Sequence, residues 1–206
     1  MTSSLSRYEF AGDAALTRRL MKRYASFFDV GPVVDLGSGR GFFLEALRER
    51  GVDGVGVDIS DEAMQWAHDL RVDCVQANAI DYLRGKSGLR GVFASHLIEH
   101  LAPEAAEEMI ALAATALTKG GRLVVVTPNL KDYRTLTELF WLDTTHVRPY
   151  PGELIAAMAS RHGLTIDEVG RTFTQRYPRS LPGVVLGQIR FGRDFGFTEL
   201  FVRAHL

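Results

Sequence analysis

The chain has 206 residues, of which 24 are Lys or Arg and 25 are Asp or Glu, so its formal net charge is −1. A charge this close to zero predicts no general affinity for nucleic acids or acidic membranes. No apolar run approaches the roughly 20 residues of a membrane span. The one cysteine, Cys74, cannot form an internal disulfide, and the first residues lack the apolar core of a signal peptide. We therefore expect one cytoplasmic domain over residues 1–206 with no integral membrane segment.

Strand-like and helix-like segments alternate along the chain, which predicts an α/β fold with a mostly parallel sheet. The expected strands are 32–36, 54–57, 72–77, 91–95, 122–127, 164–169 and 198–204. The expected helices cover 13–28, 41–50, 61–70 and 152–162, with one more that begins at Pro103 and ends at Gly120-Gly121. Residues 1–29 are expected to form an N-terminal helical cap.

Two segments, 130–150 and 170–196, are longer than the connections that the alternating strands and helices require. Long loops inside compact domains are usually functional or mobile, so both are candidates for a substrate-binding role. The second segment has no acidic residue between Arg171 and Arg193. It is either a solvated surface loop or a flap that holds an anionic substrate. Its arginines are Arg171, Arg176, Arg179, Arg190 and Arg193.

A glycine-rich turn follows the first expected strand, in the run Asp35-Leu36-Gly37-Ser38-Gly39-Arg40-Gly41. Glycine allows the backbone to turn sharply and to lie against a ligand. A strand, such a turn and a helix N-terminus together form a nucleotide-type site. The dinucleotide spacing Gly-x-Gly-x-x-Gly would require glycine at position 42, which is Phe42. The turn therefore predicts an adenine-bearing cofactor of another kind.

Polar residues also follow the next three expected strands. Asp58 ends the second strand, where its carboxylate can accept both hydroxyls of a ribose or, alternatively, cap the helix 61–70. Asn78-Ala79 follows the third strand, and the side-chain carbonyl of Asn78 can accept from an adenine amino group. The run Ser95-His96-Leu97-Ile98-Glu99-His100-Leu101 follows the fourth.

This ordered set of motifs resembles class I S-adenosylmethionine-dependent methyltransferases, over about residues 30 to 170. The resemblance implies a three-layer Rossmann-like fold with a seven-stranded sheet of order 3-2-1-4-5-7-6, in which strand 7 is antiparallel. It also implies S-adenosyl-L-methionine as the cofactor. The family usually has Asp-Ala where this chain has Asn78-Ala79, which weakens the adenine contact. The implied cofactor-binding residues are Asp35, Gly37, Ser38, Gly39, Gly41, Asp58, Ile59, Asn78, Ala79 and Ser95.

A narrower resemblance concerns the acceptor side. The segments Tyr8-Glu9-Phe10, Thr127-Pro128-Asn129 and Thr145-His146-Val147-Arg148-Pro149 are similar to those of bacterial methyltransferases linked to cell-surface polysaccharides. Those proteins often have proline where this chain has Thr144. The similarity implies a small-molecule or glycan acceptor, either a saccharide or an anionic saccharide-phosphate, and a possible association with glycosyltransferases.

Methyl transfer to a sugar hydroxyl requires removal of a proton, for which histidine is the usual base at neutral pH. His96, His100 and His146 are the candidates, and we expect His146 or His100 to have the catalytic role. Either residue could instead have a structural role. If the acceptor is a phosphate, no base is needed and Arg148 becomes the important residue. No Cys/His set has metal-ligand spacing, so no metal site is expected.

Two other functions stay open. The cofactor half would look the same in a small-molecule methyltransferase that acts on quinones or natural products. A catalytically silent cofactor-binding domain of a polysaccharide enzyme complex is the other. An RNA methyltransferase is disfavoured, because the Asn-Pro-Pro-Tyr of base N-methylation is absent after the fourth strand.

Overall fold

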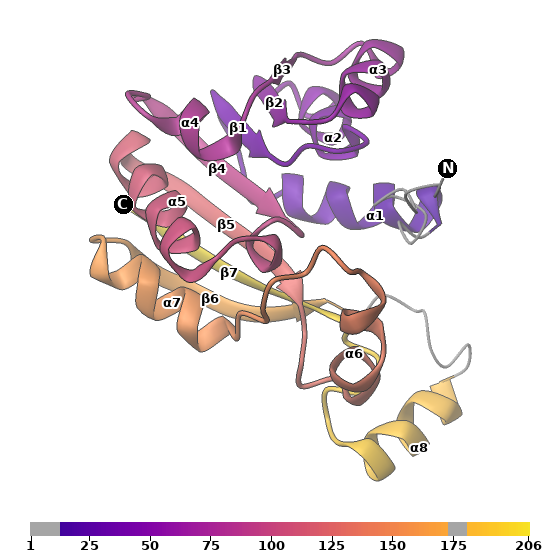
Figure 1. The fold of residues 1–206 in the computed structure, drawn as a ribbon. Helices are drawn as coiled ribbons and strands as arrows, with labels where there is room; N and C mark the ends of the chain where they lie inside the picture. Colours follow the sequence, from indigo (N-terminus) through magenta and orange to yellow (C-terminus); the bar gives the residue numbers. More distant parts are fainter. Residues whose placement is uncertain (1–12, 173–180) are drawn as a thin grey trace.

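The computed structural model describes residues 13–172 and 181–206, and these residues form one seven-stranded sheet (Figure 1). The strand order is β3-β2-β1-β4-β5-β7-β6, and β7 runs antiparallel to both neighbours while the other pairs are parallel. The expected fold is therefore confirmed. The strands are β1 (Val33–Leu36), β2 (Gly54–Asp58), β3 (Cys74–Gln76), β4 (Leu89–Ser95), β5 (Leu117–Pro128), β6 (Thr165–Thr172) and β7 (Glu199–His205).

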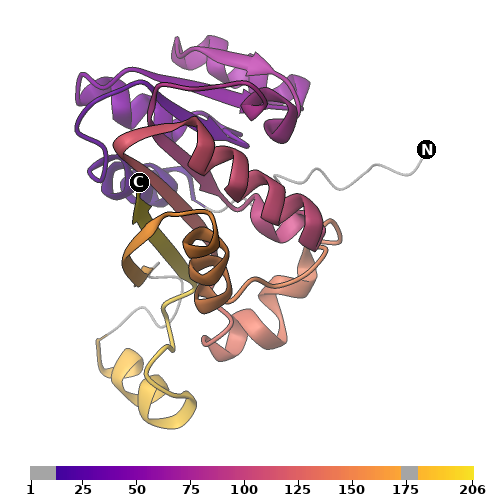
Figure 2. The ribbon, with the colours of Figure 1, turned by 90° about the vertical axis from the view of Figure 1, so that its left-hand side faces the viewer.

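Helices cover both faces of the sheet, as Figures 1 and 2 show from two directions. On one face lie α1 (Ala14–Ala25), α2 (Phe42–Glu49) and α3 (Asp61–Leu70), and on the other lie α4 (Ala79–Leu83), α5 (Pro103–Ala116) and α7 (Gly152–Arg161). The central strands are buried on both faces. In β4, for example, Val92 packs into the core on the α5 side and Phe93 into the core on the α1 side.

The boundary between α5 and β5 was predicted wrongly. The helix that begins at Pro103 ends at Ala116 rather than at Gly120, and Leu117 already belongs to β5. Leu117 is buried and pairs with Leu89 at the start of β4, with an irregularity in the register after that pair. Because β4 begins at Leu89 rather than at the expected Gly91, Leu117 pairs with it as a strand residue. The helix therefore ends before the glycines that were expected to end it.

The two insertions contain helices that the sequence did not predict. Segment 130–150 holds α6 (Tyr133–Thr137) and the 3₁₀ turn η2 (Leu139–Leu142), and segment 170–196 holds α8 (Leu181–Phe191). A second 3₁₀ turn, η1 (Ile98–His100), follows β4. Figures 1 and 2 show α8 standing off the sheet on the side of α6. Tyr8-Glu9-Phe10, Arg176 and Arg179 lie outside the described residues.

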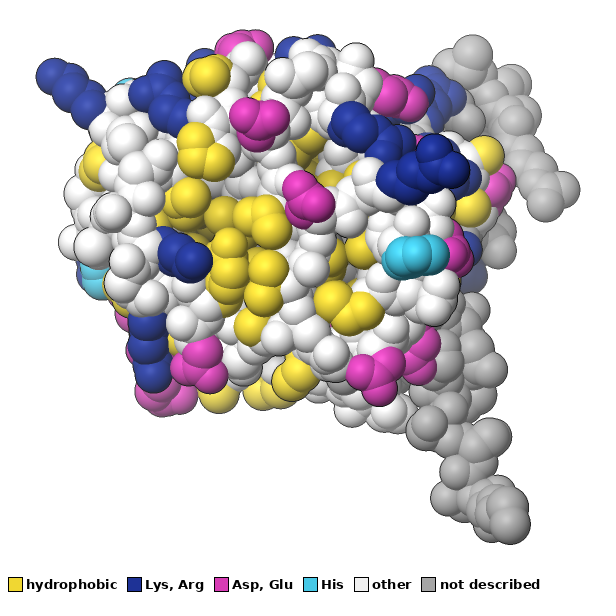
Figure 3. All heavy atoms as spheres, turned by 90° about the horizontal axis from the view of Figure 1, so that it is seen from above, with side chains coloured by type: hydrophobic (Ala, Val, Ile, Leu, Met, Phe, Trp, Pro, Cys, Tyr) yellow, Lys and Arg dark blue, Asp and Glu magenta, His cyan; other side chains and the backbone are white. Residues whose placement is uncertain are grey.

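Basic and acidic side chains are interspersed on the face shown in Figure 3, around a group of hydrophobic side chains. This mixture agrees with the near-zero net charge of the sequence. Of the helices that the structure describes, none combines the length and apolar character that crossing a membrane requires.

Candidate active site

A cavity of about 590 Å³ opens at the carboxyl ends of β1, β2 and β4. Ligands of open parallel sheets bind at this edge, where the strand order reverses. The turn after β1 and the end of β2 form one wall, and the segment 135–146 together with the end of β4 forms another. Residues from α1 and the start of α2 complete the lining. The cavity therefore joins the expected cofactor side to the expected acceptor side.

The glycine turn after β1 lies directly against the end of β2. Gly37, Gly39 and Gly41 have φ angles of 70°, 47° and 71°, in the left-handed region that glycine adopts most readily. The backbone N–H groups of Gly37 and Ser38 donate to the carbonyl oxygen of Val57, at 2.8 and 3.1 Å. The turn is thus held in place by β2, with its other side toward the cavity.

Asp58 fastens the same turn from the end of β2. Its Oδ2 accepts from the N–H of Gly39 at 2.9 Å, and its Oδ1 accepts from the N–H of Ser60 at 2.9 Å. The cap of α3 is Ser60, whose hydroxyl accepts from Ala63, so Asp58 does not have that role. A carboxylate has about four acceptor sites, so two remain for a ribose diol.

Asp35 is buried at the end of β1 and lines the cavity. Burial, reinforced by the charge of Asp58, raises the pKa of Asp35 well above its usual value. No described residue donates a hydrogen bond to its carboxyl group. Buried polar groups are normally paired, so a cationic or donor group in the cavity fits this position. The amino group of S-adenosylmethionine is such a group, and the residues present therefore fit the expected cofactor.

Eight of the residues singled out from the sequence line the cavity, and five do not. Asn78 caps α4, with its Oδ1 accepting from the N–H groups of Ile80 and Asp81, so that oxygen is already engaged. The adenine contact of Asn78 stays a prediction. Those on the cavity are Asp35, Gly37, Ser38, Gly39, Asp58, Ser95, His100 and His146. Those away from it are Gly41, Ile59, Asn78, Ala79 and Arg148.

His96 is held between two carboxylates. Its Nδ1 lies 3.0 Å from Oε1 of Glu99, and its Nε2 lies 3.2 Å from Oε1 of Glu199. Burial alone would lower the pKa of His96, but the hydrogen bonds with Glu199 and Glu99 outweigh it and raise the pKa to about 10. His96 is therefore an imidazolium at neutral pH and cannot accept a proton, which removes it from the candidate bases.

Glu99 and Glu199 belong to this hydrogen-bond network, and the sequence did not single out either residue for it. Oε2 of Glu99 accepts from the hydroxyl of Thr127, and Oε2 of Glu199 accepts from the hydroxyl of Tyr24. Although burial raises it, the hydrogen bond with His96 keeps the pKa of Glu99 below its usual value. These contacts connect α1, β5 and β7 behind His96, which has the unusual φ of 53°.

The segment around Thr145 is tied to η1 through Glu99 and His100. The N–H groups of Val147 and Arg148 donate to the carbonyl oxygen of Glu99, at 2.8 and 3.3 Å. The Nδ1 of His100 lies 2.9 Å from the hydroxyl oxygen and 3.2 Å from the carbonyl oxygen of Thr145. The two sequence motifs that carry the histidine candidates therefore form one unit.

The proton positions on His100 and His146 follow from their partners. Thr145 donates its hydroxyl proton to Asp143 at 2.6 Å, so its oxygen accepts from Nδ1 of His100. Nδ1 of His146 lies 2.6 Å from the carbonyl oxygen of Phe140, which can only accept. Both rings therefore carry a proton on Nδ1, and a ring in its neutral form has its lone pair on Nε2. Burial lowers the pKa of His100, which favours its neutral form.

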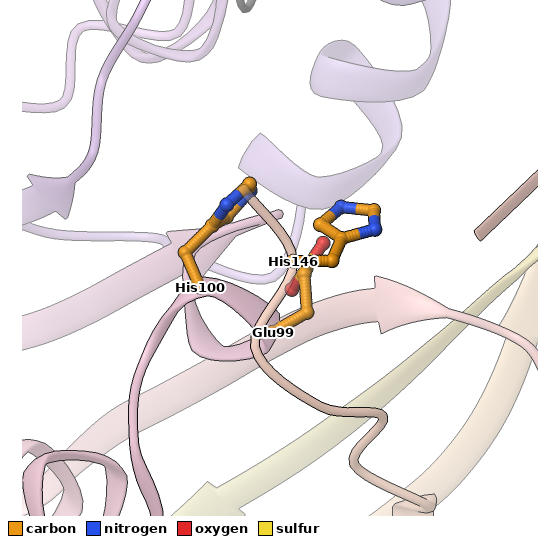
Figure 4. Close-up of side chains that lie close together, drawn as sticks. All are labelled: Glu99, His100 and His146. Carbon is orange, nitrogen blue, oxygen red and sulfur yellow. The ribbon is translucent and has the colours of Figure 1, made fainter. Parts of the chain in front are cut away.

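Figure 4 shows Glu99, His100 and His146 pointing toward a common region, and their possible ligand atoms lie within 4.8 Å of one another. Histidines and a carboxylate in this arrangement could hold a divalent cation. Both oxygens of Glu99, however, already accept hydrogen bonds, from His96 and Thr127. We therefore assign Glu99 to the hydrogen-bond network, and the absence of a metal site stays a prediction.

The described lining carries more carboxylates than cations. Arg40 is its one arginine among the described residues, and His96 is the second cation. Arg148 lies outside the lining, with its guanidinium 5.1 Å from the ring centroid of Tyr150. The acidic residues of the lining are Asp35, Asp58, Asp143 and Glu199. Their carboxylates would repel a phosphate group.

Comparison with known proteins defines the class to which this fold and cavity belong. The family described as "Methyltransferase domain" matches residues 8–169, which is most of the chain, and the chain belongs to this family. A search of curated proteins found no match.

Solved methyltransferase structures superpose on almost the whole chain. A SAM-dependent methyltransferase from Archaeoglobus fulgidus is 25% identical, with a TM-score of 0.80 and 97% of each chain covered. A chain from the complex between the Haloferax volcanii Trm112 methyltransferase activator and the putative methyltransferase is 18% identical, with a TM-score of 0.71 and 97% of each chain covered. The magnesium protoporphyrin IX methyltransferase of Synechocystis PCC 6803, with bound SAM, is 16% identical, with a TM-score of 0.66 over 99% of this chain and 91% of that one.

Proposed function

We propose that this S-adenosylmethionine-dependent methyltransferase methylates a hydroxyl group of a neutral saccharide acceptor. The observation that carries the proposal is the pair of histidines, His100 and His146, that lines the cavity opposite the glycine turn. S-adenosylmethionine supplies an electrophilic methyl carbon on a sulfonium. The remaining task of the protein is to orient the acceptor hydroxyl and to accept its proton.

His100 is the proposed general base. Its Nε2 carries the free lone pair, and the chain from His100 through Thr145 to Asp143 fixes the orientation of the ring. A neighbouring carboxylate also stabilises the imidazolium that forms when the proton is taken up. His146, whose side chain is only 10% exposed, lies with its ring centroid 4.8 Å from that of His100 and supports the same wall.

The acceptor class rests on charge and on the resemblance around Thr145 to Pro149. The acidic lining favours an uncharged acceptor over a saccharide-phosphate. Asp143 and Glu199 offer acceptor oxygens of the kind that hydrogen-bond sugar hydroxyls. A role in polysaccharide biosynthesis and an association with glycosyltransferases are part of this proposal.

A second candidate is a small apolar acceptor such as a quinol or a natural-product phenol. Leu139, Phe140 and Leu142 line the acceptor side and favour it. A screen that measures S-adenosylhomocysteine release with saccharides, nucleotide sugars and hydroxylated quinols distinguishes the two. Turnover restricted to saccharide hydroxyls supports the proposal, and turnover restricted to phenols contradicts it. Cofactor binding without turnover on any acceptor would indicate a catalytically silent domain.

A further inference from the structure

The outer face of α8 is apolar and exposed. Val185, Leu186 and Ile189 expose 51%, 66% and 78% of their surface. At 100° per residue these three positions fall within an arc of roughly 100° on one side of the helix. Soluble proteins rarely expose contiguous apolar surface without a partner for it.

The opposite side of α8 already has its contacts. The ring of Phe191 stacks on Tyr133 of α6, with centroids 5.2 Å apart, and on Phe195, with centroids 5.4 Å apart. Gly187 is buried, and a Cβ atom there would lie 2.1 Å from the ring of Phe195. The helix is therefore anchored to the domain by one side, and Val185, Leu186 and Ile189 point away from the anchor.

Two arginines lie beside this outer face, Arg190 on α8 and Arg193 just after the helix. Arg190 and Arg193 are exposed, and neither is within ion-pair distance of a carboxylate among the described residues. Arg171, by contrast, pairs with Asp194 at 2.9 Å. The sequence contains no acidic residue from Arg171 to Arg193. Exposed apolar side chains beside two arginines that form no ion pair among the described residues match the acyl and headgroup layers of an anionic bilayer surface.

We propose that the outer face of α8, formed by Val185, Leu186, Ile189 and Arg190, docks on an anionic phospholipid surface together with Arg193, which follows the helix. The net charge of −1 opposes a general affinity for such surfaces, so binding is local to α8. The helix has 11 residues and lies on the surface rather than spanning it. Phe191 of α8 stacks on Tyr133 of α6, and Thr135 of α6 lines the cavity, so docking brings the acceptor side close to the lipid.

The test is sedimentation of the full chain with vesicles, in the absence of cofactor and acceptor. Its outcome is therefore independent of the proposed acceptor. Vesicles of phosphatidylglycerol and phosphatidylethanolamine are expected to bind the protein, and vesicles of phosphatidylcholine at least about 10-fold less. Raising the salt concentration should weaken binding, because it screens the arginines.

Matched variants locate the surface. Val185→Ser combined with Ile189→Ser should reduce binding to the anionic vesicles about 10-fold or more, whereas Val30→Ser should not change it. Val30 is the matched control because it is 52% exposed, almost the same as Val185, and lies in the turn after α1. Melting temperatures close to that of the native chain would show that the variants are folded.

Two outcomes overturn the proposal. One is that the native chain does not bind anionic vesicles, or that the double variant binds as well as the native chain. The other is self-association in solution that the double variant abolishes, without vesicle binding, which would make α8 an interface between copies of this chain.

Discussion

His100 donates through Nδ1 to the hydroxyl oxygen of Thr145, at a distance of 2.9 Å. The same hydroxyl donates to Asp143, so a carboxylate on one segment orients an imidazole on another. A hydrogen-bonded orienting group behind a base is the arrangement by which histidine is set in one tautomer. This connection links η1 to the segment around Thr145 and gives the proposed base its orientation.

Replacing the proposed base tests its role directly. His100→Gln should reduce kcat by about 10²–10⁴-fold and leave the affinity for S-adenosylmethionine unchanged, because glutamine cannot take the proton. Steady-state kinetics and calorimetry measure the two quantities. His162→Gln is the control, because His162 contacts Glu107 on the α5–α7 side and does not line the cavity. Native turnover in His100→Gln would exclude the residue as the base.

Thr145→Val removes the hydroxyl that connects His100 to Asp143 and keeps the shape of the side chain. Loss of this hydrogen bond should lower kcat about 3- to 10-fold. A purely steric role for Thr145 predicts an unchanged kcat, because valine has nearly the same size.

The pH dependence of kcat reports the state of the base. Burial lowers the pKa of His100, so the neutral form persists below the ordinary histidine value of about 6.5. As the pH is lowered, kcat should therefore begin to fall only below about pH 6.5. The nearby charge of Asp143 raises the pKa of His100, so replacing it with Asn should move this acid limb to still lower pH. An acid limb well above 6.5 would contradict the assignment.

Asp58→Asn should weaken S-adenosylmethionine binding by about 10- to 100-fold for each charge-assisted hydrogen bond lost. The native carboxylate accepts from Gly39 and Ser60. We expect it to accept from the ribose hydroxyls when the cofactor is bound. Isothermal titration calorimetry measures the affinity. Asp69→Asn, on the exposed surface of α3, is the control. Equal affinities of the native chain and Asp58→Asn would refute the pocket assignment.

His96 should stabilise the fold in a pH-dependent way. Its folded-state pKa of about 10 lies above the unfolded value of about 6.5. Its contribution is therefore fully present below pH 6.5 and is lost as the pH rises toward 10. The difference in melting temperature between the native chain and His96→Gln should shrink over this range. A difference that stays constant from pH 6 to pH 10 would show that protonation of His96 does not contribute.

Most elements of the fold, and the place of the expected cofactor site, could be predicted from local sequence patterns. Alternating segments predicted an α/β fold with a mostly parallel sheet, and the residues after the expected strands included Asp58. The strand order was implied by the resemblance to class I methyltransferases. The insertions did not follow from such patterns, because α6 and α8 are short and depend on contacts such as that of Tyr133 with Phe191. Their residues have no strong helical periodicity of their own.

The network around His96 depends on contacts between distant parts of the chain. Glu199 lies 103 positions after His96, and nothing near it in the sequence marks it as a partner. Glu99 offered a weak signal, as the single acid in the stretch from Phe93 to Leu101. A buried acid at such a position requires a cationic or hydrogen-bonding partner. The partner itself emerges only when β7 is placed beside β5.

The most direct test of the central claim follows the methyl group itself. The native chain is incubated with S-adenosylmethionine carrying a ¹³C-labelled methyl group and with a panel of neutral saccharides, and the products are examined by NMR. The proposed function predicts a labelled methyl group on a saccharide hydroxyl oxygen, with loss of this product in His100→Gln. Label that appears on phosphate, nitrogen or a phenol only, or undiminished product formation by His100→Gln, would contradict it.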